Sequence, residues 1–212
     1  MLVVLHGELR LPTWEEKLPV VIIVHGSDGP TSGAVSAWRH ILDMQGLATF
    51  RLDYFTGRGI ENVETDRTRL GFLNAVYDVV EVLAADPRID KNRIFVMGFS
   101  RGGIAALYAA LALFHGYYGP KVGRIAAYLP FYASCSFGLI GETELVDAPV
   151  RAFHGEADDW VPAQPCRELF DPARDATLTT FPGVRHAFDN PRAISAVIAK
   201  AQIAAIVVGK IA

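Results

Sequence analysis

Residues 94–107 read IFVMGFSRGGIAAL, and this stretch decides the fold. An apolar run typical of a buried strand comes first, then Gly-Phe-Ser-Arg-Gly, then an alanine-rich segment typical of a helix. This is the G-x-S-x-G pattern in the strand, turn and helix context that gives it meaning. Gly98 and Gly102 leave room for a sharp turn, which would lift the hydroxyl of Ser100 above the edge of a sheet. A plain turn of small residues is the alternative, because a motif match alone is only a hypothesis.

On both sides of this segment, predicted strands alternate with predicted helices. Apolar or β-branched runs predict strands, and apolar residues at helical spacing predict helices. The expected strands are 2–11, 19–24, 48–53, 94–99, 124–130, 150–154 and 176–181, and the expected helices are 32–45, 66–85, 101 to about 114, 164–170 and 191–208. Residues 86–92 are expected to form a polar connection, and residues 131–148 an irregular segment.

This alternation predicts an α/β protein with a mostly parallel central sheet and helices on both faces. The chain has 212 residues, which suits a single domain over residues 1–212. Residues 131–148 offer the only room for a lid, and they are too few for a cap domain. We therefore expect no cap domain and an open site.

Composition limits the classes of partner. Hydrophobic residues make up 51% of the chain and the mean hydropathy is +0.24, which favours a folded protein. The net charge is −3 and no basic stripe occurs, so we expect no nucleic-acid partner. No uncharged run reaches membrane-spanning length, so no membrane insertion is expected. The last apolar segment, 194–211, leaves a monomer and a homodimer both open.

The two cysteines, Cys135 and Cys166, have no spacing that indicates a zinc site or a disulfide framework. Two free, partly buried thiols are expected, with one disulfide as the alternative. No cofactor and no metal are expected. The apolar residues near the N-terminus are too few for a signal peptide, which predicts a cytoplasmic protein. Secretion is the alternative if a leader has been removed.

Catalytic residue types follow three of the predicted strands. In this kind of sheet, catalytic residues gather at the carboxyl ends of the strands. Ser100 needs a base near neutral pKa, and histidine is that base. The histidine in turn needs a carboxylate to fix its tautomer. Residues 154–162, HGEADDWVP, and residues 183–188, GVRHAF, supply the candidates in the order Ser, Asp, His.

Among the six histidines, His186 alone follows the last predicted strand, so we predict it to be the base. His25 and His154 precede glycines at strand ends, where a histidine more often orders a loop. Asp158 and Asp159 compete for the acid, and Asp158 is preferred, with Asp159 as a polar loop residue. Plain turn chemistry is the alternative for the pair, since aspartate is common in turns.

An oxyanion formed during acyl transfer needs two preset N–H donors. One candidate is the amide of Arg101, which directly follows the serine. The other lies in the loop after the strand 19–24, where the amide of Ser27 is preferred. A glycine-rich turn without this role is the alternative for the second donor.

These segments together are similar to a known family. The His25-Gly26 loop, residues 98–102, residues 154–162 and residues 186–188 resemble the dienelactone hydrolase family of α/β hydrolases. Residues 53–59 and 86–90 also look like segments of that family. The resemblance covers nearly the whole chain from Pro19 on. It departs at Ser100, where the family's namesakes use cysteine, and at Arg101, a charged residue that could meet an anionic substrate group or pair on the helix face.

The resemblance implies an α/β-hydrolase fold and a serine-dependent esterase or lactonase that cleaves a small-molecule ester through an acyl-enzyme. Trp160 and Phe188 flank the predicted acid and base and are expected to line an apolar pocket, with packing under the loops as the alternative. Tyr54 and Arg58 follow a strand near the same rim and are candidate substrate contacts, with a capped loop as the alternative. A small serine peptidase, an acyltransferase and a catalytically silent binding protein remain the competing functions.

Overall fold

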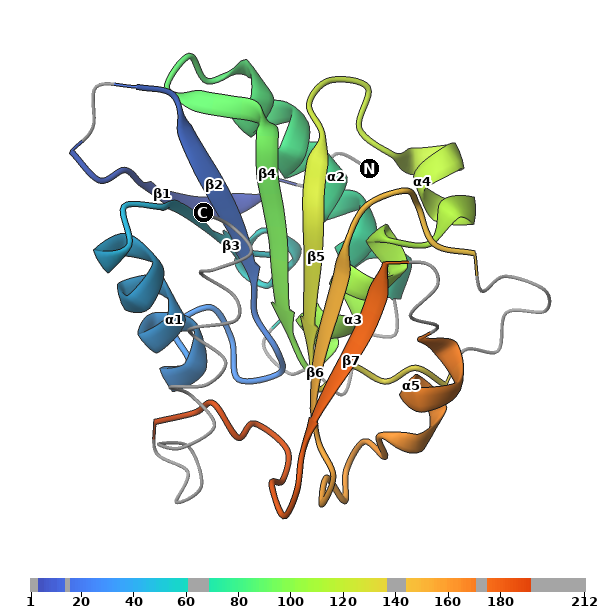
Figure 1. Ribbon diagram of the computed structural model, residues 1–212. Helices are drawn as coiled ribbons and strands as arrows, with labels where there is room; N and C mark the ends of the chain where they lie inside the picture. Colours follow the sequence, from blue (N-terminus) through green and yellow to red (C-terminus); the bar gives the residue numbers. More distant parts are fainter. Residues whose placement is uncertain (1–3, 14–15, 61–68, 137–143, 171–174, 192–212) are drawn as a thin grey trace.

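The computed structural model describes residues 4–13, 16–60, 69–136, 144–170 and 175–191. Its centre is a seven-stranded sheet in the order β1-β3-β2-β4-β5-β6-β7 (Figure 1). β1 pairs antiparallel with β3, and the other neighbouring strands pair in parallel. The strands are β1 (His6–Arg10), β2 (Leu18–Val24), β3 (Ala48–Asp53), β4 (Ile89–Phe99), β5 (Ile125–Phe131), β6 (Val150–Gly155) and β7 (Ala176–Phe181). The predicted, mostly parallel sheet is confirmed.

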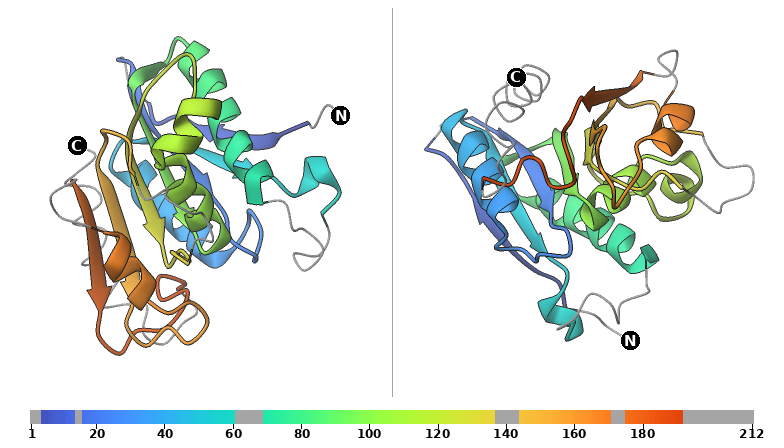
Figure 2. Two further views of the ribbon diagram at one scale, coloured as in Figure 1. Left: turned by 90° about the vertical axis from the view of Figure 1, so that its right-hand side faces the viewer. Right: turned by 90° about the horizontal axis from the view of Figure 1, so that it is seen from below.

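Helices cover both faces of this sheet (Figures 1 and 2). α1 (Gly33–Met44) packs on one face, against β2 and β3. α2 (Arg69–Ala85) and α3 (Arg101–Ala109) pack together on the other face, against β4 and β2. The shorter helices are η1 (Thr56–Arg58), α4 (Ala112–Tyr118) and α5 (Gln164–Leu169). This is the layered α/β architecture that the alternating pattern predicts.

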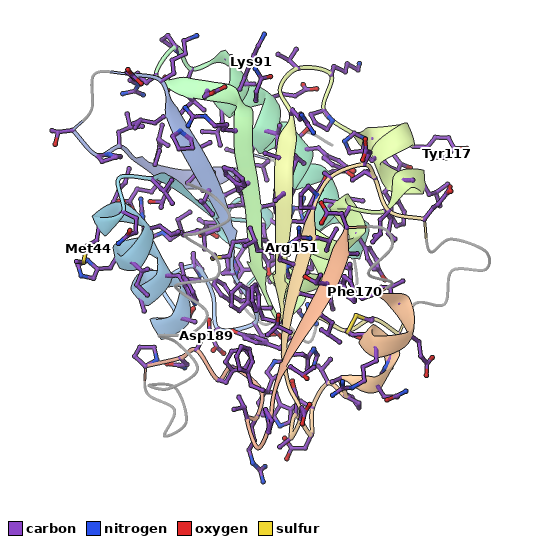
Figure 3. The ribbon with its side chains drawn as sticks, viewed as in Figure 1. Met44, Lys91, Tyr117, Arg151, Phe170 and Asp189 are labelled. Carbon is purple, nitrogen blue, oxygen red and sulfur yellow. A yellow bond between two sulfur atoms is a disulfide. The ribbon has the colours of Figure 1, made fainter. Side chains whose placement is uncertain are left out.

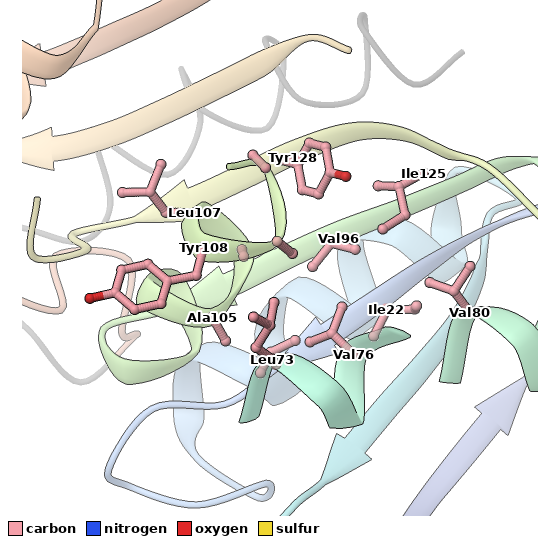
Figure 4. Close-up of a cluster of buried hydrophobic side chains, with 14 of the residues drawn as sticks. Ile22, Leu73, Val76, Val80, Val96, Ala105, Leu107, Tyr108, Ile125 and Tyr128 are labelled. Atoms are coloured by element: carbon pink, nitrogen blue, oxygen red, sulfur yellow. The ribbon is translucent and has the colours of Figure 1, made fainter. Parts of the chain in front are cut away.

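The core lies on both sides of β2 because its side chains alternate between the two faces. Val20, Ile22 and Val24 join the cluster under α2 and α3, part of which is drawn in Figure 4. Val21 and Ile23 join a second cluster with Trp38 of α1. A continuous β-branched run is what a strand with two covered faces requires. The carboxyl ends of the parallel strands lie together at one end of the sheet, the lower end in Figure 1.

The polar connection expected over residues 86–92 is confirmed only for residues 86–88, because β4 already begins at Ile89. Ile89 is 2% exposed and pairs with Leu18 of β2. Asp90 accepts hydrogen bonds from the Asn92 amide and the Arg93 side chain. The register of the β2–β4 pairing shifts between the pairs Leu18–Ile89 and Val20–Ile94, so the start of β4 is irregular and keeps local turn contacts.

The predicted helix from residue 101 to about 114 is interrupted. α3 ends at Ala109, and α4 begins at Ala112. Between them the Ala110 carbonyl accepts from the Val146 amide at 2.9 Å, and the Ala112 amide donates to the Glu144 carbonyl at 2.8 Å. Backbone groups that bond to a distant segment are lost to the helix, so the chain starts a new helix after this contact.

Cys135 and Cys166 form a disulfide, which corrects the expectation of two free thiols (Figure 3). The bond joins the segment after β5 to α5, and both residues are nearly fully buried. Their spacing in the sequence does not indicate this pairing, because the two segments come together only in the folded protein.

Some expectations lie outside the described residues, among them the helix over 191–208 and the start of the helix predicted over 66–85. The predicted strand 2–11 is described from residue 4 on, where it narrows to β1. Within the described part of the chain, no helix combines the length and the apolar character needed to cross a membrane.

Candidate active site

Ser100 occupies the sharp turn between β4 and α3. Its backbone has φ 52° and ψ −110°, a region that residues with side chains rarely adopt. Two backbone hydrogen bonds hold it there: the Ser100 amide donates to the Phe131 carbonyl at 3.0 Å, and the Ile104 amide donates to the Ser100 carbonyl at 2.9 Å. The strained turn predicted from the G-x-S-x-G pattern is therefore present, and a neighbouring strand and the first turn of α3 support it.

Both glycines of the motif are required by close backbone contacts. A Cβ on Gly98 would lie 2.0 Å from the Gly102 carbonyl oxygen, and a Cβ on Gly102 would lie 2.1 Å from the Val24 carbonyl oxygen. Neither neighbour is a flexible side chain, so a larger residue would displace the turn. The elbow therefore depends on two glycines at this spacing.

Ser100, His186 and Asp158 form a continuous hydrogen-bonded chain. Ser100 Oγ lies 3.1 Å from His186 Nε2, and His186 Nδ1 lies 2.7 Å from Asp158 Oδ2. Since a carboxylate only accepts, Nδ1 carries the proton, and Nε2 is left to accept the serine hydroxyl. This is the arrangement in which a histidine acts as a general base on a serine. The three residues predicted from the order of motifs are brought together.

The loops after β6 and β7 are held together by backbone contacts, which explains why the acid and the base meet. The Ala157 amide donates to the Val184 carbonyl at 3.0 Å, and the Glu156 amide donates to the Phe181 carbonyl at 3.0 Å. Gly155 permits this approach, because a Cβ there would lie 2.2 Å from the Val184 carbonyl oxygen.

The structure distinguishes Asp158 from its neighbour. Asp158 is 6% exposed, and its Oδ1 accepts from the amides of Trp160 at 3.0 Å and Val161 at 2.9 Å. These bonds leave Oδ2 directed at His186. Asp159 is exposed and instead forms an ion pair with Arg185 at 2.8 Å. Asp158 is thus the carboxylate that can orient the base.

A second histidine, His154, supports the same carboxylate. It is 1% exposed, and its Nε2 lies 2.7 Å from the Val161 carbonyl and 3.4 Å from Asp158 Oδ2. A carbonyl only accepts, so Nε2 carries a proton. Burial lowers the pKa of His154, which favours the neutral ring. The residue orders the loop after β6, as expected from its place before a glycine.

His25 has a similar role at the end of β2. Its ring stacks on Tyr54 with centroids 4.0 Å apart, and its Nδ1 lies 2.7 Å from the Gly26 carbonyl. Burial lowers the pKa of His25 to about 4, so the ring is neutral at pH 7. This packing sets the course of the loop that carries Ser27.

That loop lies directly against the elbow. A Cβ on Gly26 would approach Ser100 Cβ to 3.3 Å and the Phe99 carbonyl oxygen to 3.0 Å. Ser27 lines the pocket at Ser100, and α3 begins at Arg101 with the amides of its first turn directed toward the same end. Both predicted donors therefore belong to segments that border the serine hydroxyl, and their role in holding an oxyanion remains a prediction.

A pocket of about 350 Å³ opens over Ser100 and His186. Segments after five strands, β2, β4, β5, β6 and β7, and the start of α1 contribute to its wall. Its lining residues are Gly26, Ser27, Asp28, Ser32, Ala34, Phe99, Ser100, Tyr132, Asp159, Trp160, Arg185, His186, Ala187 and Asn190. Within the described residues, no group of His, Cys, Asp or Glu side chains is arranged to hold a metal ion.

The family model of the dienelactone hydrolase family matches residues 5–206 of this chain. The chain belongs to the dienelactone hydrolase family. The resemblance stated from the motifs is thereby confirmed, and with it the α/β-hydrolase fold.

Solved structures with the same fold resemble this dienelactone hydrolase family member at low sequence identity. Est1E from Butyrivibrio proteoclasticus with bound ferulic acid has a TM-score of 0.73 and 20% identity, over 98% of this chain and 95% of that one. A dienelactone hydrolase-like promiscuous phosphotriesterase from metagenomic libraries has a TM-score of 0.78 and 18% identity, over 97% and 90%. A thermophilic esterase from Thermogutta terrifontis, a Planctomycetes species, has a TM-score of 0.72 and 16% identity, over 94% and 84%.

Of the substrate contacts predicted for this family member, Trp160 alone lines the pocket. The expectation for Phe188 is not met, because its side chain is fully buried and packs on Phe181 and Tyr132 in the core. Tyr54 is 1% exposed and donates its hydroxyl to the His25 carbonyl, so it shapes the loop instead.

Two predicted arginine contacts are also absent from the lining of this pocket. Arg58 lies in η1 with its guanidinium 6.0 Å from the ring centre of Phe72. Arg101 begins α3, and the pocket is lined there by Ser100 and not by the arginine side chain.

Sequence reasoning missed Tyr132 and Asp189. Tyr132 follows β5 with φ 37°, lines the pocket, and places its ring centre 4.7 Å from that of His186. Its hydroxyl donates to Asp189 Oδ1 at 2.8 Å, and Trp38 Nε1 donates to Oδ2 at 2.8 Å. Burial, and next the Asp189 carboxylate, raise the pKa of Tyr132 far above its ordinary value, so it stays a donor. In the sequence, the only signal for this contact is that Asp189 lies three residues after the candidate base His186.

Proposed function

We propose that this protein is a serine hydrolase that cleaves carboxylic esters of small molecules through an acyl-enzyme. The observation that carries the proposal is the unbroken chain from Ser100 Oγ through His186 to Asp158, with separations of 3.1 and 2.7 Å. Membership in a hydrolase family supports the reaction class. The esterase described for Thermogutta terrifontis, which shares the fold, is consistent with the ester bond as the target.

The first half-reaction forms the acyl-enzyme. His186 Nε2 accepts the hydroxyl proton of Ser100 while Oγ bonds to the carbonyl carbon of the ester, and the C=O electron pair moves to oxygen. Amides of Ser27 and Arg101 stabilise this oxyanion. Asp158 stabilises the imidazolium and keeps the ring oriented. When the tetrahedral intermediate collapses, the C–O bond to the alcohol breaks, and His186 Nε2 protonates the leaving oxygen.

The second half-reaction repeats this chemistry with water. His186 takes a proton from water, the hydroxide attacks the acyl carbon, and Ser100 Oγ leaves with the proton returned by His186. The products are a carboxylic acid and an alcohol, and the reaction consumes one water. The sequence of steps needs no cofactor.

Hydrolysis of 4-nitrophenyl acetate and butyrate by the wild type and Ser100→Ala tests the proposal. We expect the variant to lose about 10³-fold or more in kcat, since the nucleophile and its proton transfer are both removed. Ser36→Ala is a matched control because Ser36 is exposed on α1. A fluorophosphonate probe should add its mass to the wild type and to Ser36→Ala, but not to Ser100→Ala.

Other outcomes separate the competing functions. Equal activity of the wild type and Ser100→Ala would refute the proposal at its first step. Rapid transfer to an added alcohol at the expense of hydrolysis would identify an acyltransferase. Cleavage of peptide amides at rates comparable with esters would identify a peptidase. A folded wild type that neither turns over nor reacts with the probe would indicate a silent binding protein.

A further inference from the structure

Trp160 is exposed to solvent beside the catalytic histidine. It is 79% exposed, and it lines the pocket together with Ser100. Its ring stacks on that of His186, with centroids 5.3 Å apart and planes 28° apart. Its amide donates to Asp158 Oδ1, so the carboxylate that orients His186 also fixes the backbone that carries the indole. The pocket therefore presents a broad, positioned aromatic surface that is largely exposed among the described residues.

The position of the indole indicates which part of an ester would reach it. In the proposed reaction, His186 Nε2 must protonate the oxygen of the departing alcohol, so the alcohol portion lies beside the imidazole. A ring that stacks on this imidazole lies next to the alcohol and not next to the oxyanion. Planar groups stack on indole more favourably than bulky saturated ones because the ring faces can approach closely.

The charges around the pocket restrict the substrate further. Asp28 and Asp159 line it with exposed side chains, and the arginine among the described lining residues is Arg185. Arg185 already pairs with Asp159 at 2.8 Å, which leaves the Asp28 carboxylate uncompensated by it. The described lining residues thus carry one more negative than positive charge, which disfavours an anionic group on a substrate in this pocket.

We propose that the pocket selects uncharged esters whose alcohol portion carries a planar aromatic ring, which stacks on Trp160. This inference rests on the proposed esterase function and adds the substrate class. The acyl portion remains small, because the ring occupies the Trp160 side of a pocket of about 350 Å³.

Two matched pairs of esters test the inference with the full-length protein. Benzyl acetate and cyclohexylmethyl acetate differ in the planarity of the alcohol, whereas methyl phenylacetate and methyl cyclohexylacetate differ in the acyl group. kcat/KM is measured by acid release with a pH indicator. When the ratio of the two kcat/KM values is compared between the wild type and a variant, the intrinsic reactivities of the esters cancel.

We expect the wild type to prefer benzyl acetate over its saturated partner by about tenfold, the size of effect that an aromatic contact and its buried area provide. Trp160→Leu should abolish most of this preference, and Trp160→Phe, which keeps a flat ring, should retain part of it. Tyr117→Ala is the matched control, since Tyr117 is 77% exposed on α4 and does not line the pocket. The acyl pair should show no preference that depends on Trp160.

Three outcomes would overturn the inference and remain distinct from failure of the proposed function. Equal losses for both acetates in Trp160→Leu would mean that the indole only supports His186. A wild type that hydrolyses both acetates equally well would exclude selection by stacking. A Trp160-dependent preference found only in the acyl pair would mean that the indole contacts the acyl portion of the ester and not the alcohol portion. If the wild type hydrolyses neither these four esters nor 4-nitrophenyl acetate, the proposed function itself fails, and the inference with it.

A charged analogue tests the electrostatic part. At low ionic strength the wild type should hydrolyse 4-(acetoxymethyl)benzoate more slowly than benzyl acetate, by about two- to tenfold. Asp28→Asn should bring the rates of hydrolysis of the two esters closer together. Added salt should do the same, because it screens exposed charges. A ratio that is insensitive to both changes would show that Asp28 does not exclude anions.

Discussion

Tyr132 donates its hydroxyl to Asp189 Oδ1 at 2.8 Å, and both side chains are almost completely buried. The second oxygen of Asp189 accepts from Trp38 Nε1, so one carboxylate joins the end of β5, the helix α1 and the loop that carries His186. Asp189 lies beside α1 in Figure 3. A buried carboxylate is tolerated where charge-assisted hydrogen bonds satisfy it, as they do here.

Asp189→Asn should destabilise the fold and lower activity. The asparagine side chain has one accepting oxygen and one donating NH2 group. It therefore cannot accept from Tyr132 with one atom and from Trp38 with the other. We expect the free energy of unfolding to fall by about 2–3 kcal/mol. Tyr132→Phe removes one of the two donors and should cost less, about 1–2 kcal/mol. Urea denaturation measures both values, and an Asp189→Asn variant as stable as the wild type would contradict this role for the carboxylate.

Asp158 and Asp159 should differ sharply when each is changed to asparagine. Asp158→Asn keeps the size of the side chain, but its amide can donate to His186 Nδ1. The imidazole proton then sits on Nε2, which can no longer accept from Ser100, so kcat should fall by about 10³–10⁴-fold. Asp159→Asn removes an exposed ion pair with Arg185 and should change kcat by less than about threefold. Nitrophenyl ester kinetics on the two variants measure this contrast. Similar losses in both would mean that the acid is shared or misassigned.

Stability should decrease in mild acid because of His25. Folding lowers the pKa of His25 from 6.5 to about 4, mainly through burial. Above pH 6.5 the ring is neutral in both states and has no effect. As the pH falls, the unfolded chain binds a proton that the folded protein does not, which costs up to about 3 kcal/mol by pH 4. Burial of His154 acts in the same direction.

His25→Phe should flatten this dependence, since phenylalanine can stack on Tyr54 but cannot bind a proton. Urea denaturation at pH 7, 6 and 5 gives the slope for each protein. The variant should lose less stability than the wild type between pH 7 and 5, whatever its absolute stability. Parallel slopes would show that His25 is not the buried group that titrates.

The disulfide between Cys135 and Cys166 should stabilise the fold. It spans 31 positions of sequence, and closing a loop of that length in the unfolded chain is worth about 3–4 kcal/mol. The double variant Cys135→Ala with Cys166→Ala should therefore melt at a lower temperature. In denaturant, thiol titration should find no thiols before reduction and two after it. Two thiols before reduction would contradict the bond.

Much of the fold and the core of the site follows from local patterns. The β-branched run in β2 has a clear physical signature because both of its faces are covered. The strand, elbow and helix around Ser100 are just as readable, since only glycines fit at Gly98 and Gly102. The order Ser, Asp, His along the chain then makes His186 the candidate base, because the carboxyl ends of parallel strands lie at one end of the sheet.

Other features depend on contacts between distant segments, and no local pattern reports them. Asp158 and Asp159 are equivalent by composition, and only the bonds from the Trp160 and Val161 amides show which one faces His186. Tyr54 and Phe188 are placed correctly at the rim of the sheet by sequence, but neighbouring rings bury them.

Local sequence patterns are enough to predict the layered α/β fold, the elbow, and Ser100 and His186 as candidate nucleophile and base, because side-chain periodicity and glycine sterics act within a few residues. Four features could be seen only in the tertiary structure: the disulfide, the hydrogen bonds of Asp189, the break between α3 and α4, and the exposure of Trp160. Each of these arises where segments far apart in the chain meet across the sheet. Their energies depend on burial and geometry that no single stretch of residues contains.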